Sequence, residues 1–178
     1  MTLIYEPQED SYLFSEVLEE FLPSLLDINP DLNFLEVGSG SGIQLKKVRD
    51  LGVKNILGLD INREAVEHCK TLGFEVFHSN LFEKVQGKYD LIIFNPPYLP
   101  EDLLEDKESK LATTGGSNGS KIINSFLMDS KSYLKKGGKI FLLTSSLTKG
   151  INWSSYKKEL IKERSLFFEK LFIWRLTT

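Results

Sequence analysis

The stretch LEVGSGSG, residues 35–42, joins a short apolar run to a turn that has glycine at every second position. The apolar run at 34–37 is typical of a buried strand, and a helical pattern follows from about residue 42 to residue 50. Glycines such as Gly38 and Gly40 permit a tight turn and let a ligand approach the backbone without meeting a Cβ atom. The stretch therefore predicts a ligand-binding turn between a strand and a helix.

The rest of the chain continues this alternation of strands and helices. Apolar runs predict strands at residues 55–60, 74–78, 89–94, 139–144 and 167–176, and periodic patterns predict helices at residues 11–26, 62–72 and 120–136. Such an order is typical of parallel βαβ units. We expect an α/β fold with a doubly wound, mostly parallel sheet and an antiparallel edge strand.

Three local features of this pattern carry more detailed predictions. Asp10 or Ser11 is the expected N-cap of the first helix, and Pro23 is expected to end or bend it. The pair Gly137-Gly138 is expected to stop the helix at 120–136. Residues 152–165 are compatible with either a helix or a strand of a hairpin.

Length and composition limit the classes of protein. The 178 residues fit one compact domain, residues 1–178. A net charge of -3 does not indicate a basic surface for binding duplex nucleic acid. Cys69 is the only cysteine, so neither a disulfide framework nor a metal site is predicted. The first residues do not resemble a signal peptide, and no apolar run approaches the roughly 18 residues that span a bilayer. We expect a cytoplasmic protein that does not bind membranes.

An acidic residue follows the glycine turn at the spacing of a nucleoside site. Asp60 ends the second strand about 20 residues further on, where a carboxylate can bind two ribose hydroxyls. NAD would need donors for its pyrophosphate, whereas the carboxylate of Glu36 beside the turn suits an ammonium group. The predicted cofactor is S-adenosyl-L-methionine, with S-adenosyl-L-homocysteine as product. Asn80 and Leu81 follow the third strand and are expected to face the adenine, although Asn80 is also compatible with a simple turn.

The motif Asn95-Pro96-Pro97-Tyr98 follows the fourth strand and predicts the chemistry. A planar, conjugated NH2 group is a poor nucleophile because its lone pair is delocalised. The Asn95 side-chain oxygen and the Pro96 carbonyl can each accept one N–H of such a group, and Tyr98 can pack on its plane. The alternative is a turn with a structural tyrosine.

These motifs together resemble the HemK/PrmC-like glutamine methyltransferases, most closely their short archaeal and eukaryotic branch. The resemblance rests on segments in family order: residues 5–11, 35–42, 59–62, 95–98 and 115–119. It implies a class I S-adenosylmethionine-dependent methyltransferase (Rossmann-like) fold, with residues 1–178 as one methyltransferase domain. It also implies methylation of the glutamine N5 in the Gly-Gly-Gln motif of a translation termination (release) factor. It also implies that Ser11 lines the cofactor pocket with Glu36, Gly38, Asp60, Asn80, Leu81 and Asn95, that residues 95–98 bind the glutamine, and that Gly115 and Gly116 lie near the substrate.

The resemblance carries two further expectations. Members of this branch often form a heterodimer with a small zinc-binding activator, and the strand at 74–78 is the expected edge for such a partner. The apolar side chains of this strand are equally compatible with packing under local helices. The short tail after Gly150 suggests that one of the last two strands is trimmed or replaced. Many relatives have aspartate where Asn80 stands, which is a departure from the pattern.

The residues alone leave the substrate open. An exocyclic NH2 of adenine or guanine is also planar and conjugated, so a nucleic-acid methyltransferase is the main alternative. A lysine target fits less well because its amine needs deprotonation. A non-catalytic binding protein would not need Asn95, Asp60 and the glycine turn together.

Overall fold

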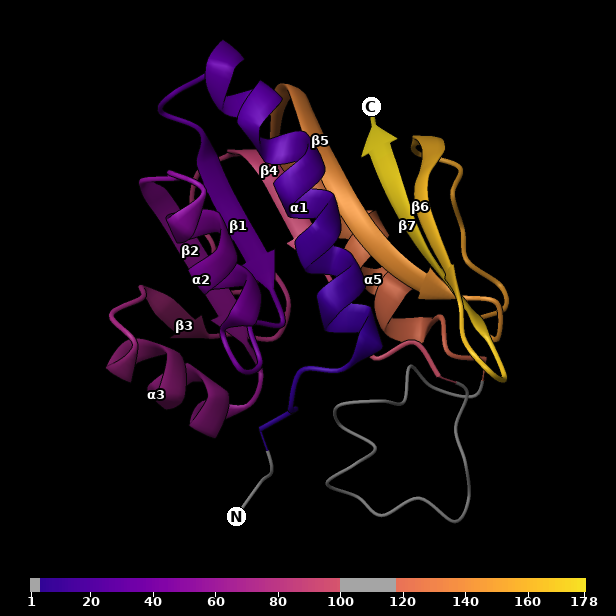
Figure 1. The fold of residues 1–178 in the computed structure, drawn as a ribbon. Helices are drawn as coiled ribbons and strands as arrows, with labels where there is room; N and C mark the ends of the chain where they lie inside the picture. The colour runs from indigo at the N-terminus through magenta and orange to yellow at the C-terminus, as the bar shows by residue number, and fades with distance from the viewer. Residues whose placement is uncertain (1–3, 100–117) are drawn as a thin grey trace.

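A computed structural model describes residues 4–99 and 118–178. Its centre is a seven-stranded sheet in the order β3-β2-β1-β4-β5-β7-β6 (Figure 1). The strands are β1 (Asn33–Val37), β2 (Asn55–Asp60), β3 (Val76–His78), β4 (Tyr89–Phe94), β5 (Leu134–Ser145), β6 (Lys157–Ser165) and β7 (Lys170–Thr177). The helices are α1 (Glu9–Ile28), α2 (Ile43–Asp50), α3 (Arg63–Thr71), α5 (Lys121–Ser130) and the short 3-10 helix η1 (Lys131–Tyr133).

The first five strands are parallel, and β7 runs antiparallel to both of its neighbours, β5 and β6. From β1 the chain first builds outward to β2 and β3, then returns to place β4 and β5 on the other side. The order of the strands therefore reverses between β1 and β4. In open α/β sheets ligands bind at such a reversal, outside the carboxyl ends of the strands. The predicted fold class is confirmed.

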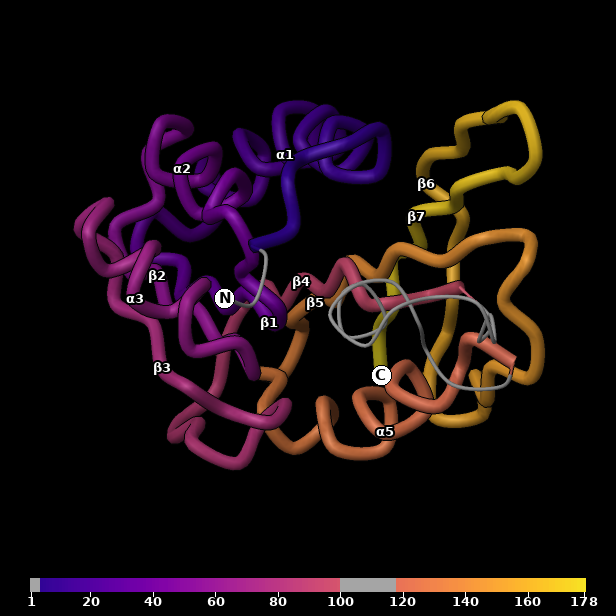
Figure 2. Tube along the Cα trace, turned by 90° about the horizontal axis from the view of Figure 1, so that it is seen from below, coloured from indigo at the N-terminus to yellow at the C-terminus, as the bar shows by residue number. Residues whose placement is uncertain are grey.

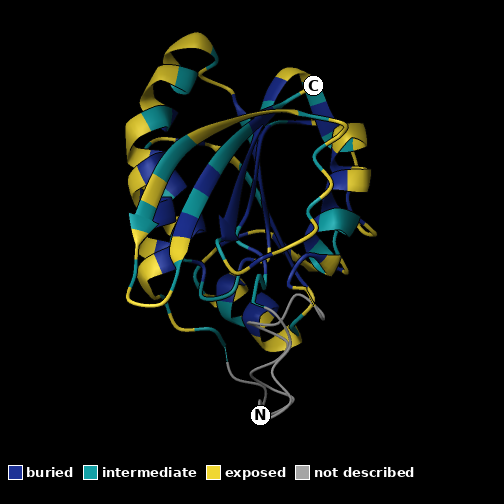
Figure 3. Ribbon diagram, turned by 90° about the vertical axis from the view of Figure 1, so that its right-hand side faces the viewer, coloured by how far each residue is buried: buried dark blue, intermediate teal, exposed yellow. Residues whose placement is uncertain are grey.

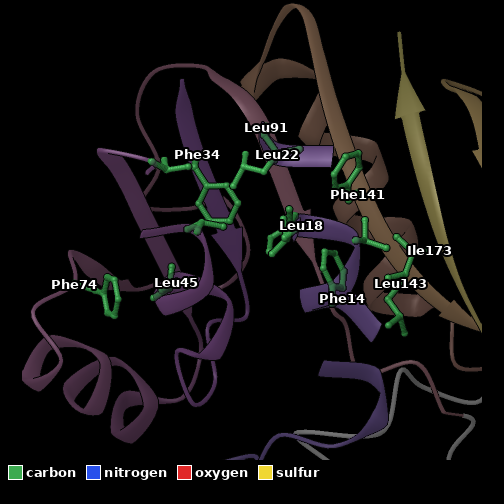
Figure 4. Packing of buried hydrophobic residues seen from close by; sticks show 14 of the residues in the cluster. Phe14, Leu18, Leu22, Phe34, Leu45, Phe74, Leu91, Phe141, Leu143 and Ile173 are labelled. Carbon is green, nitrogen blue, oxygen red and sulfur yellow. The ribbon is translucent and has the colours of Figure 1, made fainter. Parts of the chain in front are cut away.

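Helices cover both faces of the sheet. Figure 2 shows α1 and α2 on one side of the strands and α5 on the other. Successive residues of β4 enter alternate layers: Leu91 and Ile93 pack with α1, while Ile92 and Phe94 pack with α5. Figure 4 shows the layer that packs with α1. Figure 3 shows the buried strands between helices whose outer faces are exposed. Burial on both faces explains why β4 is nearly all apolar.

The predicted N-cap of α1 is wrong, and the helix does not end at Pro23. The helix continues through Pro23 to Ile28, and its N-cap is Gln8, so Asp10 and Ser11 lie buried in its first turn. A proline inside a helix costs about 3 kcal/mol. Leu22 is fully buried and Leu25 and Leu26 pack against the same core, and burial of one such side chain contributes about 1.5–3 kcal/mol. Packing therefore outweighs the local preference.

The boundary after α5 was also predicted wrongly. The α-helix ends at Ser130, and Gly137-Gly138 lie inside β5 rather than at a helix end. The pairing of β4 with β5 is irregular there, passing from Tyr89–Leu134 to Leu91–Lys139. A Cβ atom on Gly138 would lie 2.9 Å from the Lys135 carbonyl oxygen. The glycines allow a bulge that returns β5 to register.

The tail contains both final strands, so the predicted loss of one is wrong. Residues 157–165 form β6, which settles the open choice in favour of a hairpin with β7. The last strand begins at Lys170, and Phe167 and Phe168 lie exposed in the turn before it. Arg164 of β6 pairs with Glu9 and Glu16 of α1, which holds the hairpin against that helix. None of the helices in the described parts of the chain is both long and apolar enough to cross a membrane.

Candidate active site

Strand register brings the three predicted motifs together. Val37 of β1 lies beside Leu59 of β2 and beside Phe94 of β4. The next residue of each strand segment is therefore Gly38, Asp60 or Asn95, all at one edge of the sheet. Segments up to 57 residues apart in the chain thus lie together, although no local sequence pattern links them.

The glycine turn is held to the end of β2 by hydrogen bonds. The backbone N–H groups of Gly38 and Ser39 donate to the Leu59 carbonyl oxygen at 2.8 and 3.0 Å. The N–H of Gly40 donates to Asp60 Oδ2 at 2.8 Å. Gly38 and Gly40 have φ values of +73° and +49°, where a side chain would be strained. The turn and the acidic residue form one unit.

Asp60 keeps acceptor capacity in this unit. Its Oδ1 accepts the N–H of Asn62 at 2.8 Å, and Oδ2 accepts the N–H of Gly40. Burial raises the pKa of Asp60, and these backbone N–H groups oppose the rise. A carboxylate offers about four lone-pair sites, so these backbone donors do not use all of its acceptor capacity. A pair of ribose hydroxyls is one ligand that would donate to the remaining lone pairs.

Glu36 is a buried carboxyl group with one oxygen that accepts no hydrogen bond from the described residues. Its side chain lies on β1 just before the turn, and Oε2 is buried with no hydrogen-bond partner among the described residues. Burial raises the pKa of Glu36 well above its ordinary value, and the nearby Asp60 adds to the rise. A buried charge needs a partner. An ionised Glu36 would therefore need a cation or a strong hydrogen-bond donor at this position.

Asn95 has one amide atom paired and the other free. Its Nδ2 donates to Asp10 Oδ2 at 2.9 Å, while its Oδ1 is buried without a partner among the described residues. Asp10 was predicted only as a helix cap, yet it sits in this network, where Tyr5 Oη also donates to its Oδ1 at 3.0 Å. An unpaired buried acceptor costs about 1–3 kcal/mol. A ligand that donates to Oδ1 would remove that cost.

These groups line a cavity of about 420 Å³, a size typical of small-ligand sites. The predicted site residues that line it are Ser11, Glu36, Gly38, Gly40, Asp60, Asn80, Leu81, Asn95, Pro96, Pro97 and Tyr98. Asn80 is exposed at its edge and donates to Glu83 Oε1 at 3.1 Å. Gly115 and Gly116 lie outside the described residues. Their role, and that of each lining residue, stays a prediction.

Some lining residues were missed. Gln44 Nε2 donates to the Ser11 carbonyl oxygen at 2.7 Å, and Gln44 Oε1 accepts a hydrogen bond from Ser15 Oγ at 3.0 Å. The two bonds fix α1 against α2. Glu169, in the β6–β7 turn, accepts a hydrogen bond from Ser145. Tyr5 and Asp10 belong to the segment 5–11 whose order resembled a family motif, so that segment was the available signal. No sequence signal marks Glu169, because only folding of the hairpin brings it to the cavity.

Comparison with known proteins identifies the family. A model of a methyltransferase domain matches residues 8–96, and a model of the Eco57I restriction-modification methylase matches residues 72–170. A provisionally named protein N5-glutamine methyltransferase of Methanocaldococcus jannaschii is 38% identical over 97% of this chain and 92% of its own length. The chain belongs to the protein N5-glutamine methyltransferase family. It is an S-adenosylmethionine-dependent methyltransferase, as the sequence predicted.

The chain is also similar to a second curated protein and to a solved structure. The release factor glutamine methyltransferase of Streptococcus pneumoniae is 33% identical over 71% of this chain, which spans half of that protein. The solved Mtq2 of E. cuniculi, in its complex with Trm112, superposes with a TM-score of 0.73, 22% identity and coverage of 97% and 96% of the two chains. The second likeness supports the methyltransferase fold.

Replacing Glu36 should have opposite effects on stability and on cofactor binding. Because the folded-state pKa is raised, the neutral form is the stable one, and its stabilisation is lost as pH rises through that pKa. Glu36→Gln should therefore raise the melting temperature of the ligand-free protein near neutral pH. It should weaken S-adenosylmethionine binding by about 10–100-fold, the loss of one charge-assisted hydrogen bond. Differential scanning fluorimetry and calorimetric titration measure the two effects.

The pH dependence supplies the control. Wild-type affinity should fall as pH is lowered through the raised pKa of Glu36, because the ammonium group of the cofactor needs the ionised carboxylate. The Glu36→Gln protein should show a flatter profile over the same range. Equal slopes for the two proteins would exclude this carboxylate as the partner of the ammonium group.

Proposed function

We propose that this chain transfers a methyl group to the side-chain amide nitrogen of the glutamine in the Gly-Gly-Gln motif of a translation release factor. The proposal rests on Asn95 Oδ1, which is buried and accepts no hydrogen bond from the described residues. Asn95 lines the cavity, so this oxygen can accept an N–H group of the substrate there. The names of the relatives support the same substrate. We treat residues 1–178 as one methyltransferase domain and expect it to act in the cytoplasm, where release factors work.

The residues present fit S-adenosylmethionine. In the proposed arrangement the unpaired Glu36 Oε2 accepts the methionine ammonium, and the free lone pairs of Asp60 accept the ribose hydroxyls. Leu81 and Asn80 face the adenine, and Ser11, Gly38 and Gly40 enclose the remaining surface. The cofactor supplies a methyl group on a positively charged sulfur. The protein has to hold a weak nucleophile next to it.

The motif at 95–98 holds the glutamine in this proposal. Asn95 Oδ1 and the Pro96 carbonyl oxygen each accept one N–H of the flat amide, which favours localisation of the nitrogen lone pair. Tyr98 packs on the amide plane. The Tyr98 carbonyl oxygen accepts Thr148 Oγ1 at 2.8 Å, and a Cβ atom on Gly119 would lie only 2.2 Å from that oxygen. The glycine thus permits a close backbone approach that keeps the motif in place.

A protein substrate is favoured by the surface next to the cavity. Phe167 and Phe168 are 93% and 85% exposed in the β6–β7 turn, and the following residue, Glu169, lines the cavity. A pair of exposed aromatic side chains beside an acidic residue suits the apolar surface of a protein. Nucleic acid would instead require basic side chains to neutralise its phosphates. We propose that these two rings contact the release factor outside its Gly-Gly-Gln motif, and that Gly115 and Gly116 contact the motif itself.

The second candidate substrate is an exocyclic amine of a nucleic-acid base. The match of residues 72–170 to a restriction-modification methylase favours it, since that segment includes the Asn-Pro-Pro-Tyr motif. The net charge of -3 opposes it. A lysine substrate would need a base for its ammonium proton, whereas Asn95 offers only an amide oxygen.

The main test is methylation of a release factor from the same organism, followed by mass spectrometry. The wild-type protein, with its activator if one is required, should add one methyl group to the motif glutamine. A release factor with that glutamine changed to alanine should stay unmodified. Methylation of RNA or of a lysine in place of the glutamine would establish one of the alternatives.

Asn95→Ala is the matched enzyme variant for this assay. It should lose turnover by about 100-fold or more, in line with the loss of one preorganised polar contact to the reacting group. Cofactor affinity should stay close to the wild-type value, because the proposed contacts of Asn95 are with the glutamine. A variant that kept full turnover would show that the amide has no part in the reaction.

The aromatic turn can be tested separately. The double variant Phe167→Ser/Phe168→Ser should raise KM for the whole release factor by about tenfold, the effect of losing roughly 1–2 kcal/mol of apolar contact. It should leave KM for a short Gly-Gly-Gln peptide unchanged. Ile28→Ser/Met128→Ser is the control, since those side chains are 83% and 77% exposed and lie in α1 and α5 away from the turn. Equal KM values for all three proteins would exclude the turn from substrate binding.

We also propose a small partner protein, zinc-binding by the family resemblance, on the opposite edge of the sheet. The solved Mtq2 structure contains Trm112 as a second protein. Here β3 is the outer strand, and no other described strand pairs with its free edge. Val76 is buried, whereas Phe77 is 41% exposed and lines a groove with His78 and Tyr89. A partner strand that pairs with β3 would cover that ring.

Phe77→Asp should weaken this heterodimer by at least about tenfold, because a charge would replace a buried ring in the interface. The matched control is Leu160→Asp, which changes a side chain of equal exposure, 41%, on the other outer strand, β6. Co-purification and calorimetric titration with a small zinc-binding protein related to Trm112 measure the effect. Similar losses in both variants would place the interface elsewhere.

A further inference from the structure

We infer that Asp10 is a positioning residue, which sets the orientation of the Asn95 amide so that its oxygen, rather than its NH2 group, faces the substrate. The inference deepens the proposed function and rests on it. The two ends of an asparagine amide have nearly the same shape, so steric fit does not select between them. A hydrogen-bond partner of fixed polarity is needed, and Asp10 lies 2.9 Å from Asn95 Nδ2.

Asp10 is suited to this role because an ionised carboxylate only accepts hydrogen bonds. If the Asn95 amide turned over, its Oδ1 would face Asp10 Oδ2, and two acceptors would be in contact. In the observed orientation Nδ2 donates to Asp10, and the buried Oδ1 is left for a ligand. The orientation is therefore decided by polarity, at a residue 85 positions away in the chain.

Asp10 is itself held in one position. Its Oδ1 accepts the backbone N–H of Ser11 at 2.7 Å and the Tyr5 hydroxyl at 3.0 Å. The Ser11 N–H is one of the free donors in the first turn of α1, which also favours a negative charge there. The side chain is 4% exposed. With Oδ1 occupied on one side, Oδ2 remains directed to Asn95.

This arrangement gives a reason for the burial of Asp10 and Ser11 in the first turn of α1. Ser11 also contacts Gln44 through its carbonyl oxygen at 2.7 Å, so the start of the helix is tied to α2. A cap at the helix end would have needed neither contact. The start of α1 thus contacts Asn95, on the proposed substrate side of the cavity, through Asp10. It lines the proposed cofactor side through Ser11.

The isosteric variant Asp10→Asn tests the inference. Its oxygen is required by the Ser11 N–H, so its NH2 group faces residue 95 and favours the reversed amide. Turnover on the release factor should fall by about 100-fold, with S-adenosylmethionine affinity close to wild type. The control is Glu9→Gln, which changes the neighbouring, exposed carboxylate that pairs with Arg164, and should keep wild-type turnover.

The exchange variant Asp10→Asn/Asn95→Asp separates positioning from a structural role. A carboxylate at position 95 presents an oxygen in either orientation, so turnover should recover by at least about tenfold over Asp10→Asn alone. Asp10→Asn added to Asn95→Ala should cause no further loss, because no amide remains to be oriented. A loss that is additive in that background and not recovered by the exchange would show that Asp10 only supports the fold.

A crystal structure of the wild-type protein with S-adenosylhomocysteine and a Gly-Gly-Gln peptide tests the same point without any variant. One atom of the Asn95 amide should lie within hydrogen-bond distance of the peptide amide nitrogen, and the other should keep its contact with Asp10. Loss of the Asp10 contact in that complex would overturn the inference. If the wild-type protein does not methylate the release factor at all, the proposed function fails first. If it does, and Asp10→Asn retains full turnover, only the positioning role fails.

Discussion

The register of three parallel strands is the constraint on which the site depends. Val37, Leu59 and Phe94 lie side by side, so the residues that follow them emerge at one edge in a fixed order. A slip of one position in any of these strands would move its side chains to the other face of the sheet. Both layers of the core oppose such a slip, because successive residues of β4 are buried on opposite faces. The packing of the core therefore also sets the geometry of the cavity.

Two buried polar atoms that line the cavity lower the stability of the folded protein. Glu36 Oε2 and Asn95 Oδ1 are buried without partners among the residues that the structure describes. Both belong to rigid elements or to turns that follow directly from them, so neither can relax towards solvent at low cost. Binding sites are where such costs are retained, since a matching ligand then gains the full hydrogen bond without paying to remove water from the acceptor.

The two edges of the sheet differ in a way that separates their uses. On one side β6 and β7 form a hairpin that is tied to α1 by ion pairs and ends in exposed aromatic residues next to the cavity. On the other side β3 has three residues and a free edge, and it lies beyond β2, away from that hairpin. The proposed substrate contact at the hairpin and the proposed partner contact at β3 would therefore use different surfaces of the same domain.

The sequence by itself determined the fold class, the glycine turn, Asp60 and the motif at 95–98, because these depend on local patterns and on the rule that parallel strands meet at one edge. Only the tertiary structure decided that α1 passes through Pro23, that the tail is a hairpin and that Asp10 contacts Asn95. Each of these depends on contacts between segments far apart in the chain. Burial of Leu22 outweighs the unfavourable effect of Pro23 inside the helix. The buried carboxylate of Asp10 selects one orientation of the Asn95 amide. Neither effect can be inferred from a local stretch of sequence, because both arise only when distant segments pack together in one core.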